Sequence, residues 1–203
     1  FKPIPKKTVW GGTTVRDYWH YDWMPDGVGQ AWAFADQGDE SNVCVSGEFE
    51  GKTLGELWRE HSELFGDTDR VFPVIVSLLG PEDDLSIQVH PDDEHAKPLG
   101  FPYGKNEAWY FLEAEPDAAI VFGHNATDEE DLLSYIDEGR WDDLIGHLPV
   151  KRDDFVYVPS GLLHACCKGT VVYEIQQSTD VTYRFYDYDR VQADGSLREL
   201  HLE

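Results

Sequence analysis

Short segments that alternate apolar and polar side chains, each followed by turn residues, dominate the sequence from residue 73 onward. Alternation with a period of two is typical of strands that bury one face. Strands at this close spacing favour a jelly roll or β-barrel over a helical fold. We therefore predict a mainly β architecture, a jelly roll or β-barrel of short strands. The segments are 73–80, 85–90, 107–114, 118–123, 154–159, 164–167, 170–177 and 181–189.

Two segments interrupt this pattern with helix signals. Thr53 and Glu56 have the spacing of a capping box, and an apolar stripe of helical period follows to residue 65. Thr127 and Glu130 have the same spacing before a second stripe, which Gly139 is placed to end. A further short helix is expected up to residue 148. The predicted domain is one β unit over residues 1–203, with small helical insertions near 53–65 and 127–148.

Composition limits the possible partners. The 203 residues are 41% hydrophobic and carry a net charge of −24. That length can bury a core, but the charge repels phosphates at long range and argues against nucleic-acid binding. A phosphorylated ligand would need a local cluster of cations, or a metal, to reverse the field. No run of 18 apolar residues exists, so no membrane span is expected.

The three cysteines indicate the compartment. Cys44, Cys166 and Cys167 are an odd number without a disulfide framework, which is typical of a reducing cytoplasm. We predict a cytoplasmic protein in which these are small buried side chains rather than metal ligands.

Four polar residues on three of the predicted strands form a candidate metal site. Gln88 and His90 lie two apart, so in a strand they share one face. Glu107 opens a second strand, and His164 follows a Pro-x-Gly turn in a third. Two imidazoles and a carboxylate, with an amide as a possible fourth donor, suit a divalent metal that keeps an open position. A lone histidine in a strand is more often a hydrogen-bonded polar residue, so the prediction rests on the whole set.

The sequence segments around these four residues resemble known motifs. Residues 154–164 resemble the second cupin motif, and Gln88-x-His90 with Glu107 resembles the first, with Gln in place of the usual first His. More specifically, HPDDEHA, GKNEAWYF, VYVPSGLLHA and YRFYDYDR resemble the type I phosphomannose isomerase (mannose-6-phosphate isomerase) family in its short bacterial form. The resemblance runs along nearly the whole chain.

That family is a zinc-dependent aldose–ketose isomerase that interconverts mannose 6-phosphate and fructose 6-phosphate. The resemblance therefore implies an isomerase of carbohydrate metabolism with a small phosphorylated sugar as substrate. It also implies one Zn²⁺ per chain, with Gln88, His90, Glu107 and His164 as ligands.

The resemblance further implies Arg184 as the catalytic residue and Lys105 as a substrate-binding residue. Alternation places Thr182, Arg184 and Tyr186 on one face of a strand. A guanidinium keeps its charge at any working pH, so Arg184 suits stabilisation of an enediolate better than proton abstraction. Metal-bound water, Lys105 and Glu174 all remain open as proton carriers.

The sequence departs from the family pattern at two points. Gln30 stands where the family usually has Glu, which keeps the shape and loses the charge. The short members continue into a second, C-terminal jelly roll. These 203 residues do not include it, so we expect either a fragment or an unusually short relative. Two other functions therefore stay open. One is a non-catalytic or degenerate sugar-binding paralogue; the other is a non-haem iron cupin oxygenase, because two His and a carboxylate also suit Fe(II). The oligomeric state is not predicted.

Overall fold

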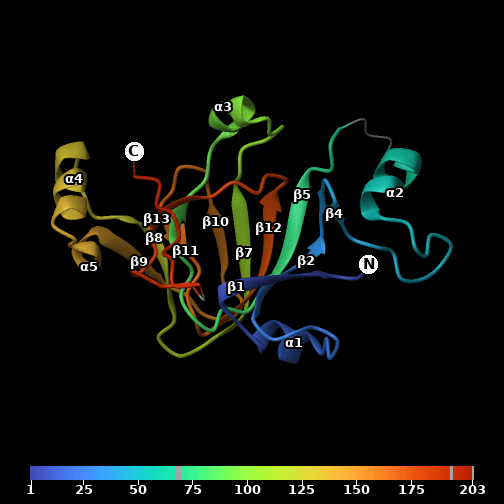
Figure 1. Cartoon of the computed structure of the whole chain (residues 1–203), viewed down its shortest axis with the longest axis horizontal. Helices are drawn as coiled ribbons and strands as arrows, with labels where there is room; N and C mark the ends of the chain where they lie inside the picture. The colour runs from blue at the N-terminus through green and yellow to red at the C-terminus, as the bar shows by residue number, and fades with distance from the viewer. Residues whose placement is uncertain (67–69, 193, 203) are drawn as a thin grey trace.

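The computed structural model describes residues 1–66, 70–192 and 194–202, and its strands form two main sheets (Figure 1). Every pair of neighbouring strands is antiparallel. The larger sheet has the order β1-β2-β5-β12-β7-β10. Its strands are β1 (Ile4–Gly12), β2 (Val28–Phe34), β5 (Val74–Leu79), β12 (Thr170–Gln177), β7 (Glu107–Ala114) and β10 (Phe155–Val158).

The smaller sheet has the order β13-β6-β11-β8-β9. Its strands are β13 (Tyr183–Tyr186), β6 (Ile87–Val89), β11 (His164–Ala165), β8 (Ala119–His124) and β9 (Ile145–Pro149). The mainly β prediction is confirmed. Within the described residues the strands pair as two separate sheets rather than as one closed barrel, which is the jelly-roll form of the expectation.

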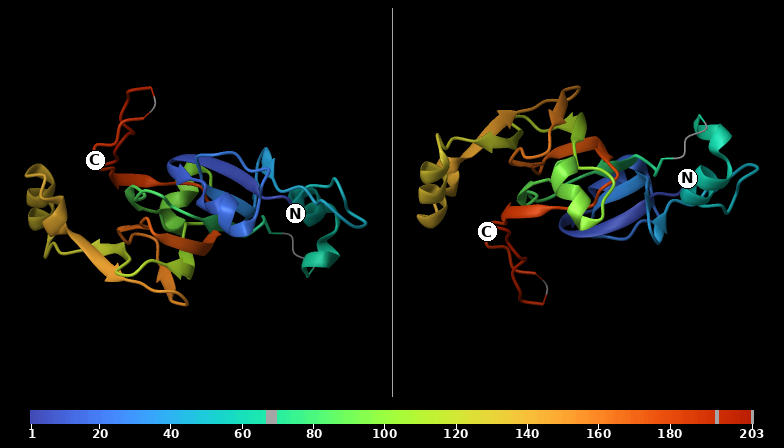
Figure 2. Two further views of the ribbon diagram at one scale, coloured as in Figure 1. Left: turned by 90° about the horizontal axis from the view of Figure 1, so that it is seen from below. Right: turned by 90° about the horizontal axis from the view of Figure 1, so that it is seen from above.

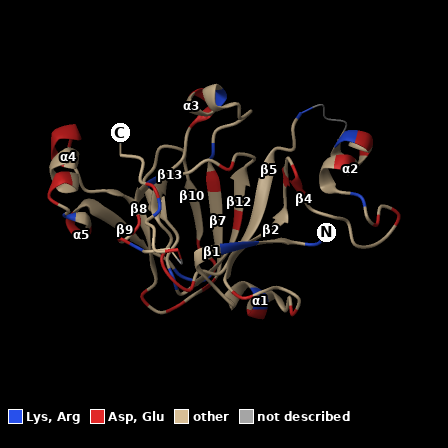
Figure 3. Cartoon of the chain, viewed as in Figure 1, with Lys and Arg blue, Asp and Glu red and all other residues tan. Residues whose placement is uncertain are grey.

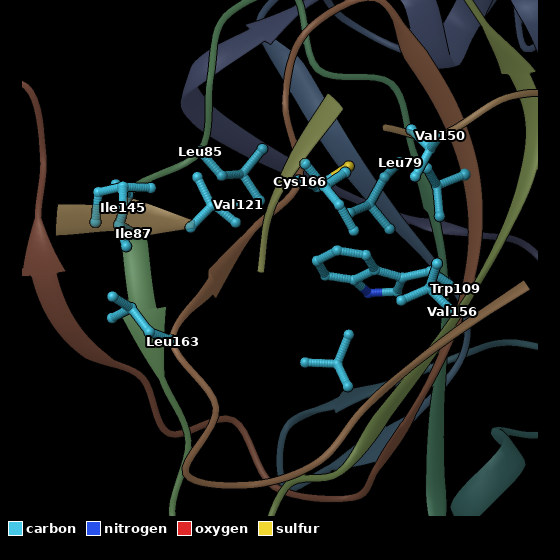
Figure 4. Packing of buried hydrophobic residues seen from close by; sticks show 14 of the residues in the cluster. Leu79, Leu85, Ile87, Trp109, Val121, Ile145, Val150, Val156, Leu163 and Cys166 are labelled. Carbon is cyan, nitrogen blue, oxygen red and sulfur yellow. The ribbon is translucent and has the colours of Figure 1, made fainter. Parts of the chain in front are cut away.

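One hydrophobic core joins the two sheets. Figure 4 shows Ile87 and Leu163 facing Trp109 and Val156 across it. These residues belong to strands or turns of different sheets, so the layers pack face to face as in other two-layer β folds. The buried members also include Leu79, Phe111, Ile120, Val121, Ile145, Val158, Ala165, Cys166 and Val172. A smaller cluster lets α1 (Thr14–Trp19) cover the outer face of β2 and β5 through Val15, Val28 and Leu78.

The first helical segment begins as predicted. α2 (Leu54–Glu60) starts at a capping box in which the Thr53 hydroxyl accepts from the Glu56 amide and the Glu56 carboxylate accepts from the Thr53 amide. A 3₁₀ turn over Ser62–Phe65 follows. α2 is tied to the hairpin of β3 (Asp36–Gln37) and β4 (Glu40–Ser41), because the Gly55 amide donates to Ser41 Oγ at 2.9 Å.

The second helical segment differs from the prediction at both ends. α4 (Glu129–Asp137) is capped by Asp128, not Thr127: the Asp128 side chain accepts from the Asp131 amide at 2.9 Å. Gly139 follows the helix with a φ of +64°, which suits its predicted role. The helix expected up to residue 148 was wrong past Leu144. α5 covers only Trp141–Leu144, and residues 145–149 form β9, because the open edge of β8 offers their backbone a partner.

The helical segments lie at the two ends of the molecule. Figure 2 shows α2 at one end, α4 and α5 at the other, and the segment after β13 extending away from the sheets. A short α3 (Asp93–Ala96) follows β6. No helix in the described ranges has both the length and the apolar surface needed to cross a bilayer.

Asn42 joins three backbone segments beside the larger sheet. Its side chain is fully buried and accepts from the Ala35 amide at 2.6 Å. Its Nδ2 donates to the carbonyls of Lys2 at 2.9 Å and Trp32 at 2.8 Å. A buried polar group that loses its partner keeps its desolvation penalty, so these bonds fix the start of the chain and the end of β2.

We expect Asn42→Ala to lower the free energy of unfolding by about 2–4 kcal/mol, because it strips partners from several buried backbone groups at once. Asn125→Ala is the matched control. That side chain is exposed and makes one bond, to the Asp143 carbonyl at 2.9 Å, so a loss below about 1 kcal/mol is expected. Urea denaturation of both variants measures the difference. Equal losses would show that Asn42 does not join the segments.

Candidate metal centre

His90, Glu107 and His164 meet between the two sheets. His90 follows β6, Glu107 opens β7 and His164 opens β11. Their candidate ligand atoms all lie within 4.8 Å of one another, and none of the three residues is more than 3% exposed. The structure therefore brings together three of the four residues predicted as ligands, from both sheets, in one buried place.

Hydrogen bonds orient both imidazole rings. Nδ1 of His90 lies 2.9 Å from the Val181 carbonyl, and Nδ1 of His164 lies 2.8 Å from the Leu162 carbonyl. A carbonyl only accepts, so each Nδ1 carries the hydrogen. Burial lowers the pKa of His90 to about 4 and also lowers the pKa of His164. Both rings are thus neutral near pH 7, and each Nε2 presents a lone pair.

These lone pairs face a carboxylate. Nε2 of His90 lies 3.1 Å from Glu107 Oε1, and Nε2 of His164 lies 3.5 Å from Oε2. Both Nε2 atoms and Oε2 are buried without a hydrogen-bond partner among the described residues. Acceptors that face acceptors repel one another unless a cation lies between them. The donor set and its carbonyl-anchored Nδ1 atoms fit a divalent metal with nitrogen and oxygen ligands.

A tight turn before β11 positions His164 beside His90. The Gly161 amide donates to the His90 carbonyl at 2.9 Å, and Gly161 has a φ of +79°. Only glycine adopts that backbone region at little cost, so the predicted Pro-x-Gly turn has a conformational reason. On the next strand, the Cα of His164 is the cross-strand partner of Gln88. The turn and the pairing together fix the two imidazoles on neighbouring backbones.

Lys105 lies against the same carboxylate. It is 5% exposed, and its Nζ is 3.3 Å from Glu107 Oε1. Burial by itself would raise the pKa of Glu107, but the charge of Lys105 and contacts with the two rings outweigh it and lower that pKa. Glu107 is therefore ionised, as a metal ligand must be.

A cavity of about 170 Å³ opens beside the three residues. This is below the ~300–1,000 Å³ typical of sites for drug-sized ligands, so it suits a small molecule. Of the six residues predicted for the site, Gln88, Lys105, Glu107 and Arg184 line the cavity, and His90 and His164 are not among its lining residues. Other polar lining residues are Gln30, Ser86, Glu174, Gln176, Asp180, Thr182 and Arg198.

Arg184 reaches this cavity from β13. Its Nε donates to Ser86 Oγ at 3.3 Å, and its Nη1 donates to the Glu199 carbonyl at 3.0 Å. Thr182 and Arg184 share the cavity face as predicted, but Tyr186 does not. A register shift between Arg184 and Tyr186 turns the latter onto Trp141, with ring centroids 4.4 Å apart. A bulge of this kind reverses the alternation on which the prediction rested.

Glu174 is the second buried carboxyl of the cavity. Trp109 Nε1 donates to its Oε1 at 2.9 Å, and Gln30 Nε2 lies 3.3 Å from its Oε2. Gln30 Nε2 also donates to Ser77 Oγ at 2.8 Å. Burial and the nearby charge of Glu107 raise the pKa of Glu174 to about 8. Gln30 thus supplies a neutral donor beside a carboxyl group that is largely protonated at neutral pH.

The sequence did not single out Arg198, which lines the cavity from the segment after β13. Its segment SLRELHL resembles the family, but that resemblance gave no role to Arg198, because the place of the side chain depends on its ion pair with Asp187. Of the remaining predicted residues, Gln88 is half-buried and stays a predicted fourth donor.

The metal hypothesis predicts a specific loss in Glu107→Gln. The amide keeps the shape but loses the charge that balances a dication, so we expect metal affinity to fall by more than the roughly 10–100-fold cost of losing an outer partner. Glu113→Gln, an exposed change on the same strand, should bind as wild type does. Elemental analysis after dialysis and metal titration by calorimetry measure both. A Glu107→Gln protein with wild-type affinity would contradict this ligand set.

Comparison with known proteins places the chain in a family. Residues 1–126 match the family model described as phosphomannose isomerase type I, catalytic domain. The mannose-6-phosphate isomerase ManA of Bacillus subtilis is 46% identical over 206 residues, which cover 100% of this chain and 65% of that protein. The mannose-6-phosphate isomerase of Streptococcus mutans is 42% identical, with 97% of this chain and 63% of that protein covered.

A crystal structure of the mannose 6-phosphate isomerase from Bacillus subtilis matches with a TM-score of 0.93 and 43% identity, over 98% of this chain and 64% of that one. A phosphomannose isomerase structure from Salmonella typhimurium has a TM-score of 0.67 at 13% identity, over 90% of this chain and 68% of that one, and shares the fold. The chain spans about 65% of the length of the curated relatives it matches. By its sequence match and its two-sheet fold, this chain belongs to the type I phosphomannose isomerase family.

Proposed function

We propose that this protein is a zinc-dependent isomerase that interconverts mannose 6-phosphate and fructose 6-phosphate. The observation that carries the proposal is the buried group of His90, Glu107 and His164, whose acceptor atoms face one another beside a small polar cavity. The names of the relatives supply the substrate. The cytoplasmic location and the one zinc ion per chain stay predictions of the sequence.

The reaction moves a proton between C1 and C2 of the sugar through an enediol or enediolate. A zinc ion held by His90, Glu107 and His164, with Gln88 as a fourth donor, would supply Lewis-acid stabilisation of the sugar oxygens when bound. Lys105 keeps Glu107 ionised by its charge at 3.3 Å and lines the cavity wall, where it can donate to a sugar hydroxyl.

Arg184 provides the fixed positive charge of the cavity. Ser86 and the Glu199 carbonyl hold its guanidinium through Nε and Nη1. A donor oriented before the reaction stabilises charge that develops on the C1–C2 oxygens without reorganising. Its always-protonated state excludes it as the base.

Two cavity side chains can hold a proton during the transfer, Lys105 and Glu174. Glu174 has a pKa of about 8 because it is buried near Glu107. A group with a pKa close to working pH can both accept and release a proton, which favours Glu174 as the carrier between carbon and oxygen. Trp109 and Gln30 orient its two oxygens.

One observation favours a second candidate, a sugar-binding paralogue without turnover. Gln30 replaces the family Glu directly beside Glu174, so a charge of the usual site is missing. Turnover decides between the two. The metal-loaded protein should convert mannose 6-phosphate to fructose 6-phosphate in a coupled assay, and chelation should abolish this. Binding without turnover would favour the paralogue, whereas dioxygen consumption would indicate an oxygenase.

Arg184→Lys should lower kcat by about 10²–10³-fold, the usual effect of losing one preorganised donor to developing charge. The substitution keeps the charge but loses the planar fork. Bound zinc should stay near the wild-type amount, because Arg184 is not among the ligands. Arg152→Lys, an exposed residue paired with Glu113 at 3.1 Å, is the control and should be unchanged. An unaltered kcat would remove Arg184 from the mechanism, and a loss of zinc would reassign it to the integrity of the site.

A further inference from the structure

A second guanidinium lies on the cavity wall next to Arg184. Arg198 comes from the segment after β13 and lines the same cavity. This segment runs along the free edge of β13: the His201 amide donates to the Arg184 carbonyl at 2.8 Å, and His201 Nδ1 accepts from the Arg184 amide at 3.0 Å. The other edge of β13 places Arg184 opposite Gln88. Arg198 is therefore one backbone farther from Gln88 than Arg184 is.

A buried carboxylate holds Arg198 in place. Asp187 is 4% exposed, and its Oδ2 accepts from Arg198 Nε at 2.7 Å while its Oδ1 accepts from Arg198 Nη2. Arg190 Nη2 donates to the same Oδ1 at 3.1 Å. Arg190 Nη1 also donates to Asp83 Oδ2 at 3.2 Å. The charges of Asp83, Asp187, Arg190 and Arg198 therefore balance, and Asp187 fixes the position of the Arg198 guanidinium.

One nitrogen of the Arg198 guanidinium, Nη1, is available to a ligand. Nε and Nη2 bind Asp187, and no hydrogen bond between described residues uses Nη1. The side chain of Arg198 is only 17% exposed, so the guanidinium is held rather than free to turn. Burial, and after it the neighbouring positive charge of Arg198, lowers the pKa of Arg184, while the charges of Asp187 and Glu199 act in the opposite direction. The two cations are thus close enough to interact, and a ligand anion beside them would add to the compensation from these carboxylates.

The rest of the molecule makes such a local site necessary for an anionic ligand. The chain carries a net charge of −24, and Figure 3 shows Asp and Glu on α2, α4, α5 and the surrounding loops. Lys105 is committed to Glu107 at the other end of the cavity. Arg184 and Arg198 supply positive charge on one wall of a cavity that Glu107, Glu174 and Asp180 also line. Guanidinium groups match the oxygens of a phosphate.

We propose that Arg198 binds the phosphate group of the sugar phosphate, with Asp187 as the residue that positions it. The proposal rests on the proposed function, from which it takes the substrate class. It assigns the phosphate to the outer end of the cavity and leaves Lys105 and Arg184 to the sugar. The role expected of Lys105 thereby narrows to the sugar oxygens.

The test measures binding of a hexitol 6-phosphate, which has no carbonyl and cannot isomerise. In titration calorimetry of the metal-loaded protein, Arg198→Gln should raise Kd by about 10–100-fold, the range for losing a hydrogen bond between charged groups. The dependence of Kd on salt should also weaken, because one charge of the site is gone. Arg198→Lys keeps that charge and should recover part of the affinity.

Arg190→Gln is the matched control. It removes the other cation from Asp187, but Arg190 does not line the cavity, so Kd should change less than about 3-fold. Circular dichroism and bound metal confirm that the variants fold. Equal losses in Arg190→Gln and Arg198→Gln would overturn the proposal and assign Arg198 to holding the chain segment.

The remaining outcomes separate this inference from the proposed function. Wild-type affinity in Arg198→Gln, with isomerase activity present in the unaltered protein, overturns the phosphate site and leaves the function standing. Binding that depends on Arg198, without any isomerisation, supports the phosphate site and contradicts the function. A wild-type protein that binds no hexitol 6-phosphate overturns the proposal.

Discussion

The site depends on one unfavourable arrangement, in which the ionised Glu107 carboxylate is buried against the lone pairs of His90 and His164. A buried charge without compensation costs several kcal/mol or more. Lys105 offsets part of it, but the two Nε2 atoms cannot, because carbonyl groups hold the hydrogens on Nδ1. A divalent cation between the facing sheets would offset the remaining charge, and the three candidate donors come from strands of both layers.

Three cations gather in the cavity of a strongly acidic chain. The sequence carries a net charge of −24, and Lys105, Arg184 and Arg198 line one small cavity together with Glu107, Glu174 and Asp180. Each cation is held by a defined partner: Glu107 for Lys105, Ser86 for Arg184 and the buried Asp187 for Arg198. Gln30 also affects the net charge of the cavity. A carboxylate at that position would stand beside Glu174, whereas the amide donates to it and leaves one negative charge fewer in the cavity.

Sequence reasoning succeeded where the signal was local. Alternation predicted the strands from β5 onward except β9, and the Thr53 capping box predicted the start of α2. The donor types on alternating strands, together with the resemblance, predicted Gln88, His90, Glu107 and His164, and the last three meet between the sheets. Sequence reasoning failed where tertiary contacts determine the local structure. Asp128 replaced Thr127 as the cap, residues 145–149 paired with β8 instead of extending a helix, and a bulge turned Tyr186 onto Trp141. Arg198 was missed because its place depends on an ion pair with Asp187, and sequence alternation does not predict such a pair.

The most direct test is X-ray diffraction from zinc-loaded crystals on both sides of the zinc absorption edge. The account predicts one strong anomalous peak per chain between the sheets, about 2.0–2.1 Å from Nε2 of His90 and His164 and about 2.0–2.2 Å from the Glu107 carboxylate. Zinc bound only among the acidic residues of the surface, with a water molecule or nothing between the two imidazoles, would contradict it.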